Sequence, residues 1–286
     1  MKLALGTAQF GMSYGVTNTT GQVNSNEVGE ILKFATEQGI SVLDTAVGYG
    51  NSETVLGRYD LTRFDVISKF GILHKEGKTK SLHMQAIESL KKLNIDSFYG
   101  LLLHTEQDAV GPQAAEIFAQ LDCLKSEKIT KKVGVSFYSP DVAREVITNY
   151  PLDIIQIPSN LIDNRFIEAG ILELAVQKKI EVHIRSIFLQ GLLAVSIEQR
   201  PHSFHTYQAL CLFDKEADDL HLSPVELALS HLFQHEEVAK GVIGCVSTEQ
   251  IREVITAYHS MKSKIGQLNI KSLSSTDTSL INPNTW

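Results

Sequence analysis

Short apolar segments alternate with longer segments of helical periodicity along the whole chain. The apolar segments contain few polar positions, which is typical of parallel strands buried on both faces. Each of them is followed by a segment of helix length. The expected strands are 2–6, 41–44, 65–69, 98–104, 131–136, 152–158, 181–186 and 241–244, and the expected helices are about 26–38, 52–59, 79–93, 112–127, 140–149, 166–178, 224–235 and 248–261.

Eight such strand–helix units in 286 residues fit a closed (β/α)8 TIM barrel of the α/β class better than an open sheet. No Ser-, Gly- or Pro-rich linker divides the chain, so we expect one domain over residues 1–286. The connection at about 192–222 is long for a barrel loop and suggests a functional flap or a small subdomain. The tail at about 266–286 is rich in Ser, Thr and Asn.

Local signals support these helix boundaries. Ser139 and Ser223 each precede a proline, so each pair places a capping residue before proline at the first helical position. Gly39 follows the first expected helix, where a left-handed residue commonly ends a helix.

Composition and charge narrow the class of protein. No apolar run approaches the roughly 20 residues that span a bilayer, and the first residues do not resemble a signal peptide. The net charge of -7 argues against a nucleic-acid partner, because phosphate binding requires a basic face. The cysteines, Cys123, Cys211 and Cys245, are scattered and odd in number, which favours a reducing, cytoplasmic setting.

Ionisable residues follow three successive expected strands. Asp44, Lys69 and His104 end the segments 41–44, 65–69 and 98–104, and Tyr49 lies in the glycine-flanked turn after the first of these. Active sites of such barrels lie at the carboxyl ends of the strands, and neighbouring strands are only about 4.8 Å apart. Each residue alone has an ordinary structural explanation, such as a turn, a cap or packing. Their combination predicts a group of side chains that handle protons.

The segment 43–53, "LDTAVGYGNSE", resembles the aldo-keto reductase signature Asp-Thr-Ala-x-x-Tyr-Gly-x-Ser-Glu. The resemblance implies that Tyr49 protonates a carbonyl oxygen during reduction and that His104 orients that carbonyl. Lys69 would lower the pKa of the phenol, which is ordinarily near 10, and Asp44 would hold Lys69 in place. Hydride would come from a nicotinamide cofactor.

No Gly-x-Gly-x-x-Gly or Gly-x4-Gly-Lys-Ser/Thr loop is present for a dinucleotide. The family resemblance instead implies a different set of positions. In that set Phe137 stands where Asn is usual, Arg185 occupies a place often filled by an aromatic that stacks on nicotinamide, and 186–191 would wrap the pyrophosphate. The expected cofactor-binding residues are Gly6, Thr7, Asp44, Ser136, Gln156, Arg185, Ser186, Phe188, Gln190, Gly191, Gly244, Ser247, Gln250 and Glu253.

The segment "GCVSTEQIREV", residues 244–254, resembles the part of the family that binds the adenosine phosphate. It opens a helix, and free backbone N–H groups at a helix start favour a phosphate. However, no Lys or Arg stands at the positions that usually hold the 2′-phosphate, and Arg252 aligns with a variable position. NADPH is therefore the first candidate by a small margin, and NADH is the second.

The leading functional hypothesis is an NAD(P)H-dependent reductase of an aldehyde or ketone. Segments such as "GYGNSE" and "INPNTW" resemble a bacterial branch associated with sugar or surface-polysaccharide metabolism, which makes a sugar derivative a candidate substrate. The alternatives are a cofactor-sensing regulatory subunit of the same fold and a barrel aldolase that forms a Schiff base on Lys69. A small carbonyl substrate is the expected partner, without nucleic acid or membrane, and the chain is expected to be a monomer or small homo-oligomer.

Other histidines and the single tryptophan carry weaker signals. His231 and His235 are four residues apart on an expected helix, but no third ligand follows at a recognisable spacing, so no metal is expected. His202 and His205 lie in the long connection and are expected at the surface. Trp286 could form a lid over the strand ends or could pin the tail to the side of the barrel.

Overall fold

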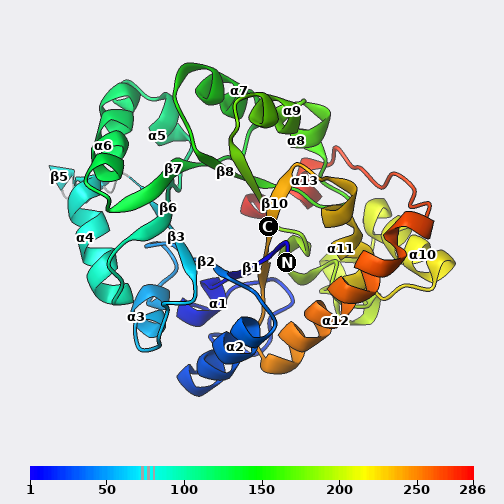
Figure 1. Cartoon of the computed structure of the whole chain (residues 1–286). Helices are drawn as coiled ribbons and strands as arrows, with labels where there is room; N and C mark the ends of the chain where they lie inside the picture. Colours follow the sequence, from blue (N-terminus) through cyan, green and yellow to red (C-terminus); the bar gives the residue numbers. More distant parts are fainter. Residues whose placement is uncertain (72–73, 76–77, 80) are drawn as a thin grey trace.

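Parallel strands close into an eight-stranded barrel in the computed structural model, which describes residues 1–71, 74–75, 78–79 and 81–286 (Figure 1). The order around the barrel is β1-β10-β9-β8-β7-β6-β3-β2, and β2 pairs with β1. The predicted (β/α)8 class is therefore confirmed. The barrel strands are β1 (Leu3–Gly6), β2 (Val42–Asp44), β3 (Asp65–Phe70), β6 (Phe98–Leu103), β7 (Thr130–Ser136), β8 (Ile154–Pro158), β9 (Glu181–Arg185) and β10 (Val238–Gly244).

Helices surround this barrel, and most begin and end near the predicted residues. The expected helix 166–178 is divided in two, because Gly170 adopts a left-handed φ of 69°. The expected helix 79–93 begins only at Leu82, and residue 80 lies outside the described part of the chain. The helices are α1 (Ala8–Gly11), α2 (Ser25–Glu37), α3 (Ser52–Leu56), α4 (Leu82–Leu93), α5 (Gln107–Val110), α6 (Ala114–Ser126), α7 (Pro140–Asn149), α8 (Arg165–Glu168), α9 (Ile171–Gln177), α10 (Gln208–Leu220), α11 (Pro224–Gln234), α12 (Thr248–Lys264) and α13 (Thr278–Ile281).

The connection at 192–222, which the sequence suggested is a functional flap or a small subdomain, is partly helical. It contains short 3-10 turns followed by α10, whose buried residues include Leu210, Phe213 and Ala217. A separate antiparallel pair, β4 (His74–Lys75) and β5 (Lys78–Thr79), lies between β3 and α4. No helix among the described residues is long and apolar enough to cross a membrane.

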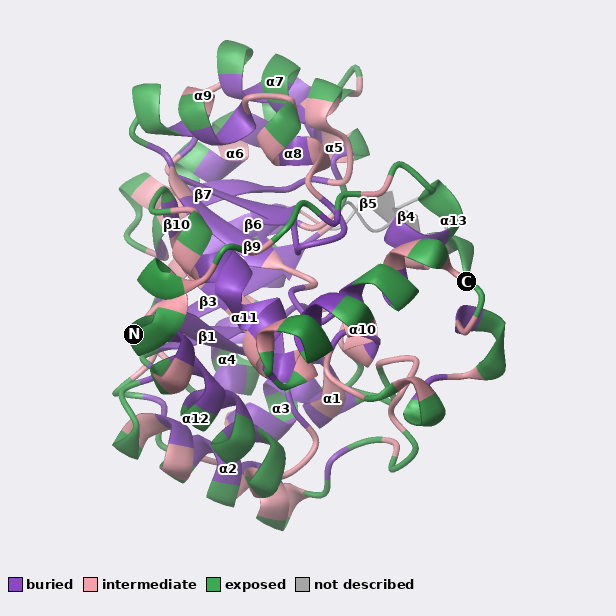
Figure 2. Ribbon diagram, turned by 90° about the vertical axis from the view of Figure 1, so that its right-hand side faces the viewer, coloured by how far each residue is buried: buried purple, intermediate pink, exposed green. Residues whose placement is uncertain are grey.

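Two apolar layers lie on either side of the barrel wall. A small cluster that includes Ala4, Ile67 and Leu102 fills the barrel, and a much larger cluster packs the strands against the helices. Figure 2 shows the strands as the buried centre of the molecule, with the exposed residues on the outer faces of the helices. Burial on both faces explains why these strands read as continuous apolar segments.

The predicted caps behave differently from one another. Ser223 forms a capping box with Glu226, and Gly39 has the expected left-handed φ of 83°. Ser139 precedes α7, but its side chain makes no capping hydrogen bond. Its backbone N–H donates instead to Glu106 Oε2 at 2.9 Å.

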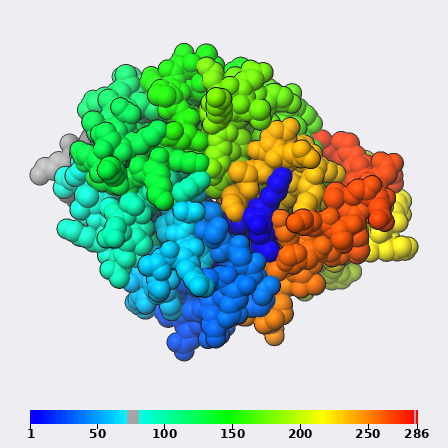
Figure 3. All heavy atoms as spheres, viewed as in Figure 1, coloured from blue at the N-terminus to red at the C-terminus, as the bar shows by residue number. Residues whose placement is uncertain are grey.

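The first residues of the chain cover the end of the barrel where the strands begin, and Figure 3 shows them at the centre of that face. Lys2 Nζ donates to the carbonyl oxygens of Leu232 and His235, and Lys240 Nζ donates to the carbonyl oxygen of Met1. These contacts hold the first residues against the amino end of the barrel, and the opposite end carries the cavity that contains Tyr49.

We predict that Gly134→Ala destabilises the barrel strongly. A Cβ atom at this position of β7 would lie 1.7 Å from the backbone oxygen of Ile154 on β8, so the two strands must separate. The expected loss is about 3 kcal/mol in the free energy of unfolding, measured by urea denaturation. Gly266→Ala is the matched control, because a Cβ there meets no atom within 4 Å. Equal stability of the two variants would contradict this account of the β7–β8 contact.

Candidate active site

The phenol of Tyr49 lies beside a buried ion pair at the carboxyl ends of β2 and β3. Lys69 Nζ donates to Asp44 Oδ1 at 2.6 Å and to the carbonyl oxygen of Thr45 at 3.0 Å. The same nitrogen lies 3.3 Å from the hydroxyl oxygen of Tyr49. The side chains of Asp44 and Lys69 are 3% and 1% exposed, so water screens their charges little. The structure thus places three of the predicted catalytic residues in contact.

Tyr49 reaches this position through a tight turn after β2. Its N–H donates to the carbonyl oxygen of Ala46 at 3.0 Å. The next residue, Gly50, has a φ of 57°, and a Cβ there would lie 2.2 Å from the backbone oxygen of Gly11. Only glycine fits both the backbone conformation and this close approach.

The Ser-Glu pair that follows ties the turn to the barrel. Ser52 Oγ donates to the carbonyl oxygen of Thr7 at 2.9 Å. The buried carboxylate of Glu53 accepts hydrogen bonds from Ser68 and Ser89, both at 2.9 Å. The residues that complete the signature motif therefore position Tyr49.

A further hydrogen bond fixes the second oxygen of Asp44. Gln156 Nε2 donates to Asp44 Oδ2 at 2.8 Å, and its Oε1 accepts from Ser136 Oγ at 3.5 Å. The register pairs Ser136 with Gln156 on neighbouring strands, and both side chains are buried. These two residues, expected to bind a carboxamide, thus also hold the carboxylate of the ion pair.

His104 packs against Tyr49 from the end of β6. The ring centroids are 5.7 Å apart at an interplanar angle of 85°. Burial, together with the cation of Lys69, lowers the pKa of His104 to about 4. The imidazole is therefore neutral at neutral pH and retains one N–H donor.

The pKa of Tyr49 differs in direction from the sequence prediction. Burial and then the charge of Asp44 raise the pKa of Tyr49 above its ordinary value of 10, and Arg185 opposes this shift. We attribute the difference first to burial, which disfavours the phenolate, and then to the nearby negative charge of Asp44. The phenol therefore keeps its proton at neutral pH.

A cavity of about 510 Å³ extends from Tyr49 to the start of α12. A larger cavity, about 660 Å³, lies where β3 and β6 begin, at the other end of the barrel from these ionisable residues. Of the predicted residues, Lys69, His104, Ser136, Gln156 and Ser247 are absent from the described lining of the smaller cavity. The predicted residues in that lining are Gly6, Thr7, Asp44, Tyr49, Arg185, Ser186, Phe188, Gln190, Gly191, Gly244, Gln250 and Glu253.

Sequence reasoning missed part of this lining. Tyr14, Thr17, Asn18 and Thr20 come from the connection between β1 and α2, and Gln199 comes from the long connection after β9. The run 13–22 is polar and unusually long between a strand and its helix, and that signal could have indicated a binding loop.

The segment after β9 holds a strained backbone conformation along the cavity. Ser186, Leu189 and Gln190 have φ values of 63°, 44° and 53°, which non-glycine residues rarely adopt. Gly191 has a φ of 102°, and a Cβ there would lie 1.9 Å from Thr17 Oγ1. Such residues each cost about 1–3 kcal/mol and cluster where a loop clamps a ligand.

Arg185 lies at the Tyr49 end of the cavity. Its guanidinium donates to the carbonyl oxygen of Phe137 at 3.1 Å and stacks over the ring of Tyr138, 4.3 Å from the centroid. Arg185 Nε is buried and has no hydrogen-bond partner among the described residues. An unpartnered buried donor is costly, so this atom is suited to an acceptor from a bound molecule.

At the start of α12, three backbone N–H groups are hydrogen-bonded to side chains of the protein. The N–H of Val246 donates to Gln250 Oε1 at 2.9 Å, and that of Gln250 donates to Ser247 Oγ at 3.2 Å. The N–H of Thr248 donates to Glu27 Oε1 at 2.5 Å. Side chains of this protein therefore already occupy donors that were expected to bind a phosphate.

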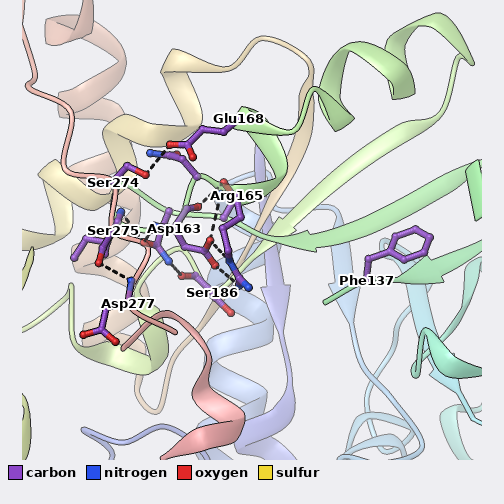
Figure 4. A network of polar contacts seen from close by, with 12 residues as sticks. Phe137, Asp163, Arg165, Glu168, Ser186, Ser274, Ser275 and Asp277 are labelled. Atoms are coloured by element: carbon purple, nitrogen blue, oxygen red, sulfur yellow. Dashed lines mark hydrogen bonds and ion pairs between the residues drawn. The ribbon is translucent and has the colours of Figure 1, made fainter. Parts of the chain in front are cut away.

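The loop after β8 forms a hydrogen bond with the backbone of the strained segment. Asn160 Nδ2 donates to the carbonyl oxygen of Ser186 at 3.0 Å, and Asn160 Oδ1 accepts from the N–H of Asp163 at 3.0 Å. The Asp163 carboxylate pairs with Arg165 at 2.8 Å, as Figure 4 shows. Asn160 thus fixes the backbone at the beginning of the strained segment.

The C-terminal tail contacts α8 and the long connection after β9. Ser274 Oγ donates to Glu168 Oε1 at 2.7 Å (Figure 4). Trp286 packs edge-on against Phe204, with centroids 4.9 Å apart, and its indole N–H donates to the carbonyl oxygen of Ser279. Trp286 is not among the residues that line the cavity in the described structure, and its contacts join the tail to the long connection after β9.

The two helical histidines have a packing role. His231 Nε2 shares a 2.8 Å hydrogen bond with Ser159 Oγ, and burial lowers the pKa of His231 to about 3. Its ring packs against that of His235, with centroids 4.8 Å apart. Within the described ranges, no group of three or more His, Cys, Asp or Glu side chains could hold a metal ion.

Comparison with known proteins identifies relatives of the whole chain. Residues 2–271 match the Aldo/keto reductase family. The NADH-specific methylglyoxal reductase of Escherichia coli (strain K12) is 28% identical over 259 residues, which cover 77% of this chain and 78% of that protein. The uncharacterized oxidoreductase YqkF of Bacillus subtilis (strain 168) is 27% identical, over 96% of this chain and 95% of that protein.

Solved structures agree on the fold. The holo form of the aldo-keto reductase AKR11C1 from Bacillus halodurans has a TM-score of 0.74 and 20% identity, covering 96% of this chain and 94% of that one. The structure of PA4992, a "putative aldo-keto reductase" from Pseudomonas aeruginosa, has a TM-score of 0.67 and covers 91% of this chain and 90% of that one.

We predict that His104 makes the stability of the protein sensitive to acid. Its pKa is about 4 in the folded state against an ordinary 6.5, so the unfolded chain binds the proton more readily. The stability that neutral His104 contributes is therefore present above about pH 6.5 and is lost as the pH falls toward about 4. Between these values, the free energy of unfolding should fall more steeply for wild type than for His104→Gln in urea titrations. Parallel pH profiles would contradict the assignment.

Proposed function

We propose that this chain, which belongs to the Aldo/keto reductase family and is therefore an NAD(P)H-dependent oxidoreductase acting on carbonyl groups, uses Tyr49 as its proton donor. The observation that carries the proposal is the contact of the Tyr49 hydroxyl with the Lys69–Asp44 pair at the end of the cavity. A protonated phenol, a fixed cation and a neutral imidazole together meet the requirements for protonating a carbonyl oxygen.

The residues along the cavity fit a nicotinamide cofactor. The unpartnered Nε of Arg185 lies at one end, the strained segment 186–191 follows the middle, and residues 244–254 form the other end. Ser136 and Gln156 are absent from the described lining of this cavity and would act at the first end through Asp44, whose carboxylate Gln156 holds. When bound, the cofactor would supply the hydride, which no side chain provides.

The proton step follows from the contacts of Tyr49. Its phenol holds the proton at neutral pH and releases it only when negative charge develops on the substrate oxygen. Lys69, 3.3 Å away, then stabilises the phenolate, and Arg185 adds a second cation. Asp44 holds Lys69 in position, and the neutral ring of His104 donates a hydrogen bond to the same carbonyl oxygen.

The aldolase alternative conflicts with the surroundings of Lys69. A Schiff base needs a neutral, accessible amine. The Lys69 side chain is 1% exposed, and its ammonium contacts acceptors on Asp44, Thr45 and Tyr49. The amine is therefore not accessible to a carbonyl substrate.

The substrate we propose is a small, polar, hydroxylated aldehyde or ketone, with sugar derivatives as the leading class. Tyr14 and Thr17 contribute hydroxyl groups to the cavity. Such groups discriminate strongly, because an apolar substrate would leave them unpaired. The name of the Escherichia coli relative, a reductase of methylglyoxal, supports a small polar carbonyl.

We predict that Tyr49→Phe loses catalysis but keeps the cofactor. Removing the hydroxyl removes the proton donor, so kcat should fall about 100- to 10,000-fold. The Kd of the reduced cofactor, measured by fluorescence titration, should change less than about twofold, since the ring remains. Tyr150→Phe is the control, because that ring stacks on Phe118 away from the cavity. Reduction at nearly the wild-type rate by Tyr49→Phe would remove Tyr49 from the proposed role.

A substrate series tests the polar cavity. We expect kcat/KM for methylglyoxal, glyceraldehyde and longer aldoses to exceed that for apolar aldehydes of matched size by about tenfold or more. Initial rates of cofactor oxidation at 340 nm measure this directly. A preference for hexanal or benzaldehyde would refute the proposed substrate class and leave the proton-donor proposal intact.

A further inference from the structure

We infer that the far end of the cavity selects NADH over NADPH, because carboxylates surround the place where a ribose 2′-phosphate would lie. The inference rests on the proposed function, since it concerns the cofactor of the same site. It follows from the charges along the cavity, the contacts of Glu27 and the position of Arg252.

The positive charge in the described cavity lining, on Arg185, lies at the end opposite to the one expected to hold a 2′-phosphate. Among the described lining residues, the charged ones are Asp44, Arg185 and Glu253. Arg185 lies beside Tyr49, at the end where hydride transfer would take place. Glu253 lies on α12 at the other end, so the adenosine portion would meet a carboxylate.

Glu27 adds a second carboxylate from a different element. It lies in the first turn of α2, and its Oε1 accepts from the N–H and the hydroxyl of Thr248, at 2.5 and 2.8 Å. This contact places negative charge at the start of α12. The charge reaches the cavity wall, because it contributes, after burial, to raising the pKa of Cys245.

The cation closest in sequence is held away from this place. Arg252 follows the α12 start, but its guanidinium lies over the ring of Phe34 on α2, 4.4 Å from the centroid. It is not among the described residues that line the cavity. A 2′-phosphate would therefore lack the Arg or Lys partner that its charge requires.

Three backbone donors at the α12 start are already engaged and do not replace that partner. Those of Val246, Thr248 and Gln250 are bonded to Gln250, Glu27 and Ser247. A 2′-phosphate would have to displace these acceptors and approach two carboxylates. A ribose 2′-hydroxyl, in contrast, can donate to a carboxylate, which is how acidic residues recognise NAD in other dinucleotide sites.

Titration of the full-length protein with NADH and NADPH, by calorimetry and cofactor fluorescence, tests the inference. We expect wild type to bind NADH about tenfold or more tightly than NADPH. Glu253→Gln and Glu27→Gln, which keep the side-chain shape and remove the charge, should each tighten NADPH binding about three- to tenfold without tightening NADH binding. Glu30→Gln, an exposed position one turn along α2 from Glu27, is the matched control and should leave the ratio unchanged.

Each outcome separates this inference from the proposed function. Equal or tighter binding of NADPH by wild type would overturn the NADH selection and leave the reductase proposal standing. No binding of either cofactor would overturn the reductase proposal itself. If Glu27→Gln loosens the α12 start, the melting temperature of that variant will fall. Glu253→Gln then provides the test, because Glu253 takes no part in the hydrogen bonds described at the α12 start. If neither variant changes the ratio of the NADH and NADPH affinities, the carboxylates are not the cause of the selectivity.

Discussion

The buried pair of Asp44 and Lys69 is the interaction on which the site depends. Two charges removed from water are costly unless hydrogen bonds satisfy their remaining atoms. Here Thr45, Tyr49 and Gln156 supply those bonds, from the loop after β2 and from β8 on the far side of the barrel. The pair therefore connects distant strands as well as holding the phenol.

Much of the barrel could be predicted because its strands follow a simple physical rule. Strands covered on both faces must be apolar throughout, and each segment read in this way became a strand of the barrel. The irregular parts were harder, because their structure depends on contacts distant in sequence. The segment 208–220 forms α10 because its apolar face packs on the molecule, and the break between α8 and α9 depends on one left-handed residue, Gly170.

The features of the site likewise separate into those that could be predicted from the sequence and those that could not. Asp44, Lys69 and His104 could be located because a strand end fixes a side chain's position, and Tyr49 because its turn carries a specific motif. The direction of the Tyr49 pKa shift could not be predicted, since it reflects burial and the competition between two nearby charges. The contact of Glu27 with Thr248 joins residues 221 positions apart and appears only when α2 and α12 pack together.

The strained segment after β9 has a consequence for how this protein changes by mutation. Ser186, Leu189 and Gln190 each have a positive φ, and only glycine fits at Gly191, because a Cβ there would clash with Thr17. Effects of substitutions in such a contact network do not add, so a change at one position alters what its neighbours tolerate. These positions should therefore vary together among related sequences, and engineered libraries that randomise them one at a time would miss the combinations that fold.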